Sequence, residues 1–157
     1  MMIGRENTEV VEFLLGGQLF AIDLFDVKEV VECPKITKIP NSEPGVKGII
    51  DLRGEITTII DLKEKLRIVP NTGTENDLHV IILDEKNIGS RMGIVVDNVL
   101  SISDYDDSNI EKDISSSNKV EGNDIIIGII KRVTRSKEED HGKLIILIDI
   151  KKVLMSK

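Results

Sequence analysis

Few side chains in this sequence are of a type and spacing that could perform acid–base or nucleophilic chemistry. Asp61 and Asp149 stand at matching places after two apolar runs, and together they could supply the carboxylate pair of a small hydrolase. Each of them precedes Leu-Lys or Ile-Lys, so capping of a following helical turn is the better interpretation. The serines at 115–117 lack the Gly-x-Ser-x-Gly context of an activated nucleophile. We therefore predict a protein that is not an enzyme, with a hydrolase as the alternative from another class.

The residue pattern gives little support to a metal site. His79 and His141 lie far apart without further ligands at metal-site spacing, and Cys33 is the single cysteine. The acidic segment 104–124 lacks the central Gly and final Glu of a calcium-binding loop. We expect no metal and no cofactor, and we expect this segment to form a long exposed loop.

Composition restricts the possible partners and compartment. The formal net charge of −7 should repel nucleic acid and anionic lipid, because phosphate binding requires a cationic surface. The start of the chain, MMIGRENTEV, has no apolar signal-peptide core, and no apolar run is long enough to span a membrane. A lone cysteine also suits a reducing compartment. We expect a soluble cytoplasmic protein with no nucleic-acid partner and no direct membrane insertion.

The stretch from Gly48 to Leu66, GIIDLRGEITTIIDLKEKL, predicts a β-hairpin that presents a cation. Two runs rich in Ile and Leu meet at Arg53-Gly54, and Gly54 can supply the positive φ that a two-residue turn requires. We also assign Gly48 a structural role in turning the chain. A strong hairpin with one exposed charge and no catalytic motif favours recognition over catalysis.

The rest of the chain consists mainly of predicted strands and turns. Its low aromatic content, 3%, leaves Ile, Val and Leu to build the core, and β-branched residues favour strands. Residues 23–32 predict a helical turn or a bent strand, and 70–77 has the composition of a linker. The remaining predicted strands are 10–15, 19–22, 79–83, 92–96, 125–130 and 144–150, with short helical segments at 61–66 and 151–155.

Two pairs of fragments suggest that the halves of the chain repeat one pattern. FAIDLFDVKEVV from Phe20 resembles MGIVVDNVLSI from Met92, and Gly48-Ile49-Ile50 with IIDLKEKL resembles Gly128-Ile129-Ile130 with LIDIKKVL. Both fragments occur in the same order in each half, so duplication explains them better than chance. The sequence therefore predicts two small β-barrels that share a core, at about 9–69 and 78–157, and leaves open whether they exchange strands.

Taken in order, these motifs resemble the CheW family of chemotaxis coupling proteins over nearly the whole chain. The family's hairpin pattern is met by Gly48, Leu52, Arg53, Gly54, Asp61 and Leu62. Further matches, which also occur in the family's order along the chain, are Ile22-Asp23, Val27–Val30, Gly93–Asp97 and Ile148-Asp149. Two positions depart from the pattern, because Asp51 replaces the common Asn and Thr58 stands where Pro is frequent.

The resemblance implies one domain over 8–157, all-β, made of two intertwined five-stranded SH3-like barrels with a short C-terminal helix. It implies no catalytic activity. Proteins of this family couple the cytoplasmic tips of chemoreceptors to the regulatory domain of a CheA-type histidine kinase, in arrays beneath the membrane. The alternative is a CheW-like scaffold in another kinase pathway, serving motility or gene regulation.

The resemblance also implies which residues would bind receptor or kinase. Arg53 comes first, and we expect Glu29 to form an ion pair with it. Val27, Val30 and Leu52 would add apolar contacts, although valines at this spacing more often belong to a core. One sequence does not decide which of these apolar side chains are exposed.

Overall fold

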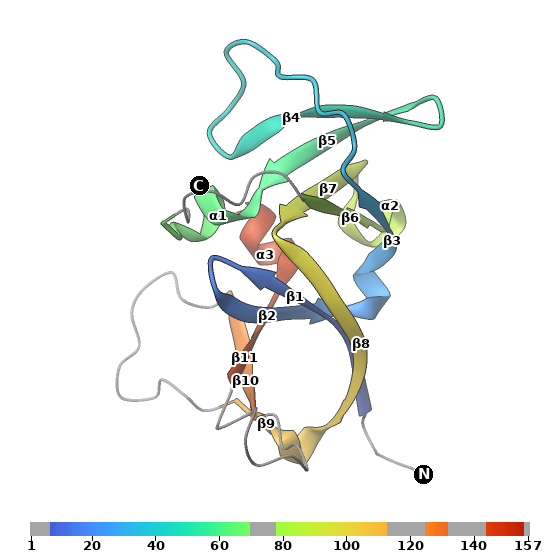
Figure 1. Ribbon diagram of the computed structural model, residues 1–157. Coiled ribbons are helices and arrows are strands. Elements are labelled where there is room, and N and C mark those ends of the chain that lie inside the picture. Colours follow the sequence, from blue (N-terminus) through green and yellow to red (C-terminus); the bar gives the residue numbers. More distant parts are fainter. Residues whose placement is uncertain (1–6, 70–77, 113–124, 132–143, 156–157) are drawn as a thin grey trace.

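The computed structural model describes residues 7–69, 78–112, 125–131 and 144–155, which form two β-sheets with short helices (Figure 1). In the first part of the chain the elements are β1 Asn7–Leu15, β2 Gln18–Asp23, the 3-10 helix η1 Leu24–Asp26, β3 Val27–Glu32, β4 Val46–Leu52, β5 Glu55–Asp61 and α1 Leu62–Leu66. In the second part they are β6 His79–Leu83, α2 Glu85–Ile88, β7 Met92–Val96, β8 Asn98–Asp106, η3 Asp107–Asn109, β9 Ile110–Glu111, β10 Ile126–Lys131, β11 Leu144–Ile148 and α3 Ile150–Met155.

The strands form a six-stranded sheet in the order β8-β1-β2-β11-β10-β9 and a five-stranded sheet in the order β3-β6-β7-β5-β4. The sixth strand of the larger sheet, β9, has two residues. Figure 1 shows the five-stranded sheet above the six-stranded one, with α3 between them. The predicted all-β class with two SH3-like barrels and a short C-terminal helix is confirmed.

Each half of the sequence contributes one hairpin to each sheet. The hairpin β1–β2 joins β10–β11 through parallel pairing of β2 with β11, where Phe20 lies opposite Ile146. The hairpin β6–β7 joins β4–β5 through parallel pairing of β5 with β7, where Ile60 lies opposite Ile94. Because each sheet needs strands from both halves, the two barrels are intertwined.

Three groups of buried side chains stabilise this arrangement. Strands alternate their side chains between two faces, so each barrel can fill its interior and still cover the other barrel. The largest group, the inter-sheet cluster, includes Phe13 and Phe20, whose rings stack with centroids 6.0 Å apart. Its buried members are Val11, Phe13, Leu15, Phe20, Ile22, Ile60, Leu62, Ile81, Leu83, Ile94, Val96, Ile148, Ile150 and Val153. The two smaller groups fill the barrels: Val10, Leu19, Ala21, Ile110, Ile130, Ile145 and Leu147 in one, and Ile50, Ile59, Val80, Ile82 and Val95 in the other.

The structure corrects the role predicted for Gly48. This residue lies inside β4, beside a register shift in its pairing with β5, and not in a turn. A Cβ atom at Gly48 would lie 2.4 Å from the carbonyl oxygen of Thr37. Thr37 lies beside β4 because it forms an isolated antiparallel bridge with Ile49. Glycine is needed here because another backbone segment passes too close for a side chain.

The second half contains more regular structure than its composition predicts. The 85–88 stretch, between the predicted strands 79–83 and 92–96, is the helix α2, capped by the Asp84 side chain and ended by Gly89 at φ 102°. The segment 104–124 was expected to be a long exposed loop, but its first residues form the end of β8, the 3-10 helix η3 and the strand β9. Serines occupy inward-facing positions of β8, so the sequence lacks the alternation of apolar and polar residues that predicts a strand. Residues 113–124, the 70–77 linker and His141 lie outside the described residues.

Candidate functional site

The turn between β4 and β5 forces Arg53 into an unfavourable backbone conformation. Arg53 and Gly54 both have positive φ values, 52° and 87°, as a two-residue hairpin turn requires. Asp51 supports the turn, since its Oδ1 accepts a hydrogen bond of 2.8 Å from the Gly54 N–H. Asn or Gly would suit the first turn position better than Arg, and strain of this kind is found preferentially at functional sites. The sequence predicted the positive φ of Gly54 but not that of Arg53.

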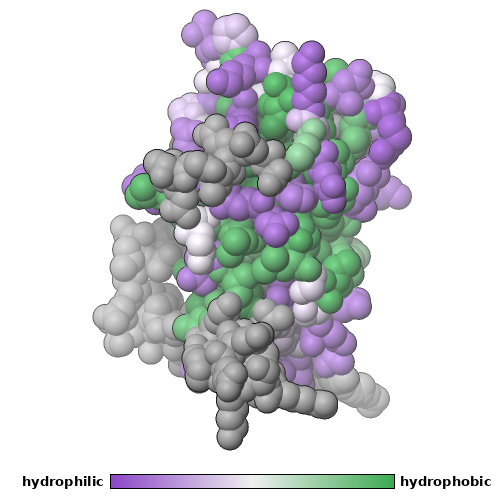
Figure 2. Space-filling model, viewed as in Figure 1, coloured by the Kyte–Doolittle hydropathy of each residue, from purple (hydrophilic) through white to green (hydrophobic). Residues whose placement is uncertain are grey.

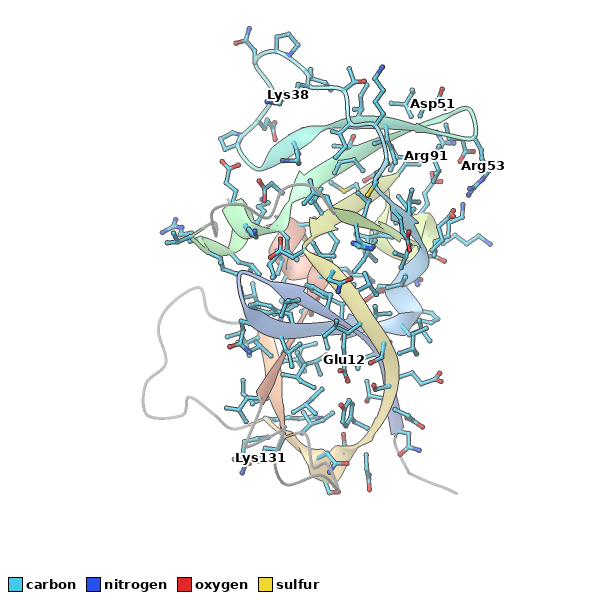
Figure 3. The ribbon with its side chains drawn as sticks, viewed as in Figure 1. Glu12, Lys38, Asp51, Arg53, Arg91 and Lys131 are labelled. Carbon is cyan, nitrogen blue, oxygen red and sulfur yellow. The ribbon has the colours of Figure 1, made fainter. Side chains whose placement is uncertain are left out.

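Arg53 pairs with Glu29, as predicted. Its Nη2 atom contacts Glu29 Oε2, and its Nη1 atom donates to Oε1 at 3.4 Å, so two guanidinium nitrogens face two carboxylate oxygens. The side chain of Arg53 is 64% exposed and that of Glu29 29%. The hydrogen bond from Arg53 lowers the pKa of Glu29 below its usual range, and the same bond raises the pKa of Arg53. Figure 3 shows Arg53 at the outer end of the hairpin.

This ion pair joins two parts of the five-stranded sheet that are not adjacent in its strand order. Glu29 lies on β3, at one edge of that sheet, and Arg53 follows β4, at the other edge. A register shift between Val27 and Glu29 sets the position of Glu29 opposite Ile82, whose side chain fills the barrel. The pair therefore lies across the end of the barrel. Exposed ion pairs add little to stability, so its main effect is to fix the orientation of the Arg53 side chain.

The three predicted apolar contact residues differ in exposure. Val30 is 39% exposed. Val27 is partly buried against the inter-sheet cluster, and Leu52 is partly buried against the interior of the five-stranded barrel. The core alternative thus describes Val27 and Leu52 better than Val30, and a binding role for all three stays a prediction.

An apolar strip between the two sheets was not predicted. Ile102 on β8 is 64% exposed and lies opposite Val11, a member of the inter-sheet cluster. Val30 on β3 lies opposite Ile81, which belongs to the same cluster. Paired residues of antiparallel strands point to the same face, so Val30 and Ile102 extend the inter-sheet cluster to the surface. Figure 2 shows apolar surface over the middle of the face in view, below a more polar upper end.

The two candidate catalytic carboxylates, Asp61 and Asp149, cap helices. Asp61 caps α1 by accepting hydrogen bonds from the N–H groups of Lys63 and Glu64, at 3.1 and 3.4 Å. Asp149 accepts one at 3.3 Å from the Lys152 N–H at the start of α3. Among the described residues, no group of three or more His, Cys, Asp or Glu side chains is arranged to hold a metal ion. In the same part of the chain, no helix is long and apolar enough to cross a membrane.

Comparison with known families identifies the architecture. The model of the CheW-like domain matches residues 9–157. The chain belongs to the CheW-like family. Membership makes it a non-catalytic adaptor, as predicted from the sequence.

Individual CheW-like proteins resemble this chain over most of their length. The chemotaxis protein CheW of Treponema pallidum is 27% identical over 160 residues, which cover 100% of this chain and 88% of that protein. CheW of Thermotoga maritima is 27% identical over 151 residues, covering 93% and 87%. The crystal structure of the scaffolding protein TtCheW from Thermoanaerobacter tengcongensis superposes with a TM-score of 0.76 at 31% identity, covering 97% of this chain and 95% of that one. The CheW-like fold thus accounts for both barrels of this chain.

Proposed function

We propose that this chain couples the cytoplasmic tips of chemoreceptors to the regulatory domain of a CheA-type histidine kinase. The observation that carries the proposal is Arg53, which is held in a strained turn, aligned by Glu29 and largely exposed. The turn requires positive φ at position 53, but Asn or Gly would meet that requirement at lower cost, and the ion pair adds little stability, so folding alone does not explain an Arg there. Recognition of a partner explains both the Arg and its pairing with Glu29.

The kinase domain would bind at the end of the five-stranded barrel. There Arg53 offers a planar, multiply donating guanidinium, which suits a carboxylate or a row of backbone carbonyls on the partner. Glu29 keeps that group oriented before binding, so less side-chain entropy is lost when the complex forms. Leu52, which precedes Arg53 at the end of β4, lies behind this surface, packed against the interior of the same barrel.

The receptor would bind along the apolar strip formed by Val30 and Ile102. Receptor tips are helical, and an amphipathic helix binds by placing its apolar face in a hydrophobic groove. The strip continues the buried cluster between the two sheets, so a helix lying on it would contact both barrels. One adaptor could then hold receptor and kinase together in the cytoplasm. Repeated weak contacts in an array gain from high effective concentration.

Co-purification with purified partners tests this proposal. Wild-type protein should retain the kinase regulatory domain and a receptor cytoplasmic fragment. Arg53→Ala and Glu29→Ala should reduce retention of the kinase domain by about tenfold, as expected for an interface hot spot. Lys112→Ala is a matched control, because Lys112 forms an exposed ion pair with Asp107 on the other barrel, at 3.4 Å. The absence of any association by wild-type protein would refute the proposal.

A further inference from the structure

Five charged side chains of alternating sign follow one another around the end of the five-stranded barrel. Glu29 pairs with Arg53, and beyond the turn Glu55 Oε2 lies 3.6 Å from Arg91 Nη2. Arg91 Nε in turn lies 3.4 Å from Glu85 Oε1. We call these five residues the charged rim. Figure 3 shows Arg53 and Arg91 at the same end of the molecule.

Backbone structure fixes the positions of the rim residues. Glu55 begins β5, directly after the Arg53-Gly54 turn. Arg91 precedes β7, and its carbonyl accepts a hydrogen bond of 3.1 Å from the Thr58 N–H. Glu85 opens α2, which is capped by Asp84 immediately after β6. The rim therefore draws on β3, β5, β7 and α2, all at the same barrel end.

The outer part of the rim contributes little to the fold. Arg91, Glu55 and Glu85 are 47%, 53% and 57% exposed, and their contacts are longer than strong charge-assisted hydrogen bonds. Exposed pairs of this kind are weak and screened by salt. An ordered alternation of charge is nevertheless informative to a partner. Juxtaposed like charges exclude a wrong partner, and opposite charges align the right one.

We propose that Arg91, with Glu55 and Glu85 on either side, determines which kinase regulatory domain this adaptor accepts. The inference rests on the proposed function, in which Arg53 makes the main contact at this barrel end. The accepted domain presents a carboxylate opposite Arg91, flanked by cations opposite Glu55 and Glu85. A related domain with the opposite charge order is rejected, although Arg53 could still reach it.

Affinity for the purified kinase regulatory domain, measured by titration calorimetry with full-length variants, tests this inference. Arg91→Glu should weaken binding about tenfold at low salt, and the loss should shrink in high salt. The matched control Lys112→Glu reverses a cation of similar exposure in the pair with Asp107, and it should leave affinity within about twofold. Melting curves verify folding, and Arg91→Met replaces Arg91→Glu if the latter does not fold.

A charge-swapped variant separates recognition from mere orientation of neighbouring side chains. In the triple variant Glu55→Arg, Glu85→Arg and Arg91→Glu, both ion pairs inside the adaptor can re-form with their direction reversed. The inference predicts that binding stays weak, since the partner still meets the wrong sign. Restored binding, or an Arg91→Glu variant that binds like wild type while Arg53→Ala does not, would overturn the inference and leave the proposed function standing. If wild type fails to bind, the proposed function fails instead.

Discussion

The Arg53 guanidinium makes a two-point ion pair with the Glu29 carboxylate, joining the β4–β5 turn to β3 across the end of the five-stranded barrel. The backbone of Arg53 is in the left-handed region, with φ 52°. A surface ion pair gives little stability in return for that conformation. The pair is therefore best understood as a device that presents Arg53.

The Glu29–Arg53 pair should respond to acid. Because the pKa of Glu29 in the folded chain lies below the ordinary value of 4.5, the pair's contribution is complete above pH 4.5 and is lost as pH falls through the lower folded value. We expect carboxyl-detected NMR to find Glu29 titrating below 4.5 in wild type and returning towards 4.5 in Arg53→Asn. Identical titration in both proteins would show that the pair is not formed in solution.

Asp97 should stabilise the junction between the sheets. Its carboxylate accepts a 2.8 Å hydrogen bond from the Gly16 N–H and pairs with Lys63 Nζ at 2.9 Å, and both charged side chains are less than one-fifth exposed. Asp97→Ala leaves both partners unsatisfied, so we expect a loss of about 2 to 3 kcal/mol in urea unfolding. Lys63→Met should cost less, because Gly16 keeps its acceptor.

The control for the junction is again the exposed pair on the other barrel. Lys112→Met should change the free energy of unfolding by less than about 0.5 kcal/mol, because both partners of that pair are 56% exposed. Asp97→Ala unfolding at the same urea concentration as Lys112→Met would contradict a stabilising role for Asp97.

Asp26 should oppose stability at neutral pH. Burial raises the pKa of its carboxyl, and nearby Asp23, Asp149 and Asp84 add to the effect, while Lys151 counteracts it. A raised carboxyl pKa favours the folded state below the ordinary value of 3.8, and this advantage is lost as pH rises through the folded value. Asp26→Asn should therefore raise the melting temperature at pH 7 and leave it nearly unchanged near pH 3. A lower melting temperature at pH 7 would contradict this.

Ile102 should be required for receptor binding but not for folding. Its side chain is 64% exposed, so Ile102→Asp should leave the melting temperature close to wild type. Affinity for a receptor cytoplasmic fragment should fall about tenfold, because a charge would enter the apolar contact. Ile56→Asp is the matched control, since Ile56 is 55% exposed on β5, at the hairpin end. Equal loss in both variants would remove the special role of the strip.

Much of the scaffold could be predicted from the sequence, because local signals determined it. The Arg-Gly turn between two runs rich in Ile and Leu predicted the β4–β5 hairpin, and Asp61 before Leu-Lys predicted the cap of α1. β8 was not predicted, since Ser101, Ser103 and Tyr105 occupy its inward positions. Tyr105 hydrogen-bonds the buried Glu12 at 2.6 Å, a tertiary contact that no local pattern reveals.

Only those residues of the candidate site that lie in recognisable sequence motifs could be predicted. Arg53 was indicated by the hairpin sequence and Glu29 by the family resemblance, whereas the pairing of Glu55, Arg91 and Glu85 depends on how β5, β7 and α2 meet at one barrel end. Likewise, the exposure of Val30 and Ile102 depends on strand order, which places β3 and β8 at sheet edges. Such relationships arise only when the two halves of the chain exchange hairpins.

The central claim is that Arg53 serves recognition, and the variant Arg53→Asn tests it most directly. Asn tolerates positive φ better than Arg, so the turn should be preserved while the guanidinium is removed. Arg67→Asn is a close control, because Arg67 follows α1 with φ 59°. This variant makes the same substitution in the same backbone conformation at a different place in the fold. Both variants should melt at or above the wild-type temperature.

Titration calorimetry with the kinase regulatory domain then gives the decisive comparison. We predict that Arg53→Asn weakens binding by at least about tenfold, while Arg67→Asn binds like wild type. Wild-type affinity in Arg53→Asn, or an equal loss in Arg67→Asn, would contradict the claim that this turn exists to present an arginine to the kinase.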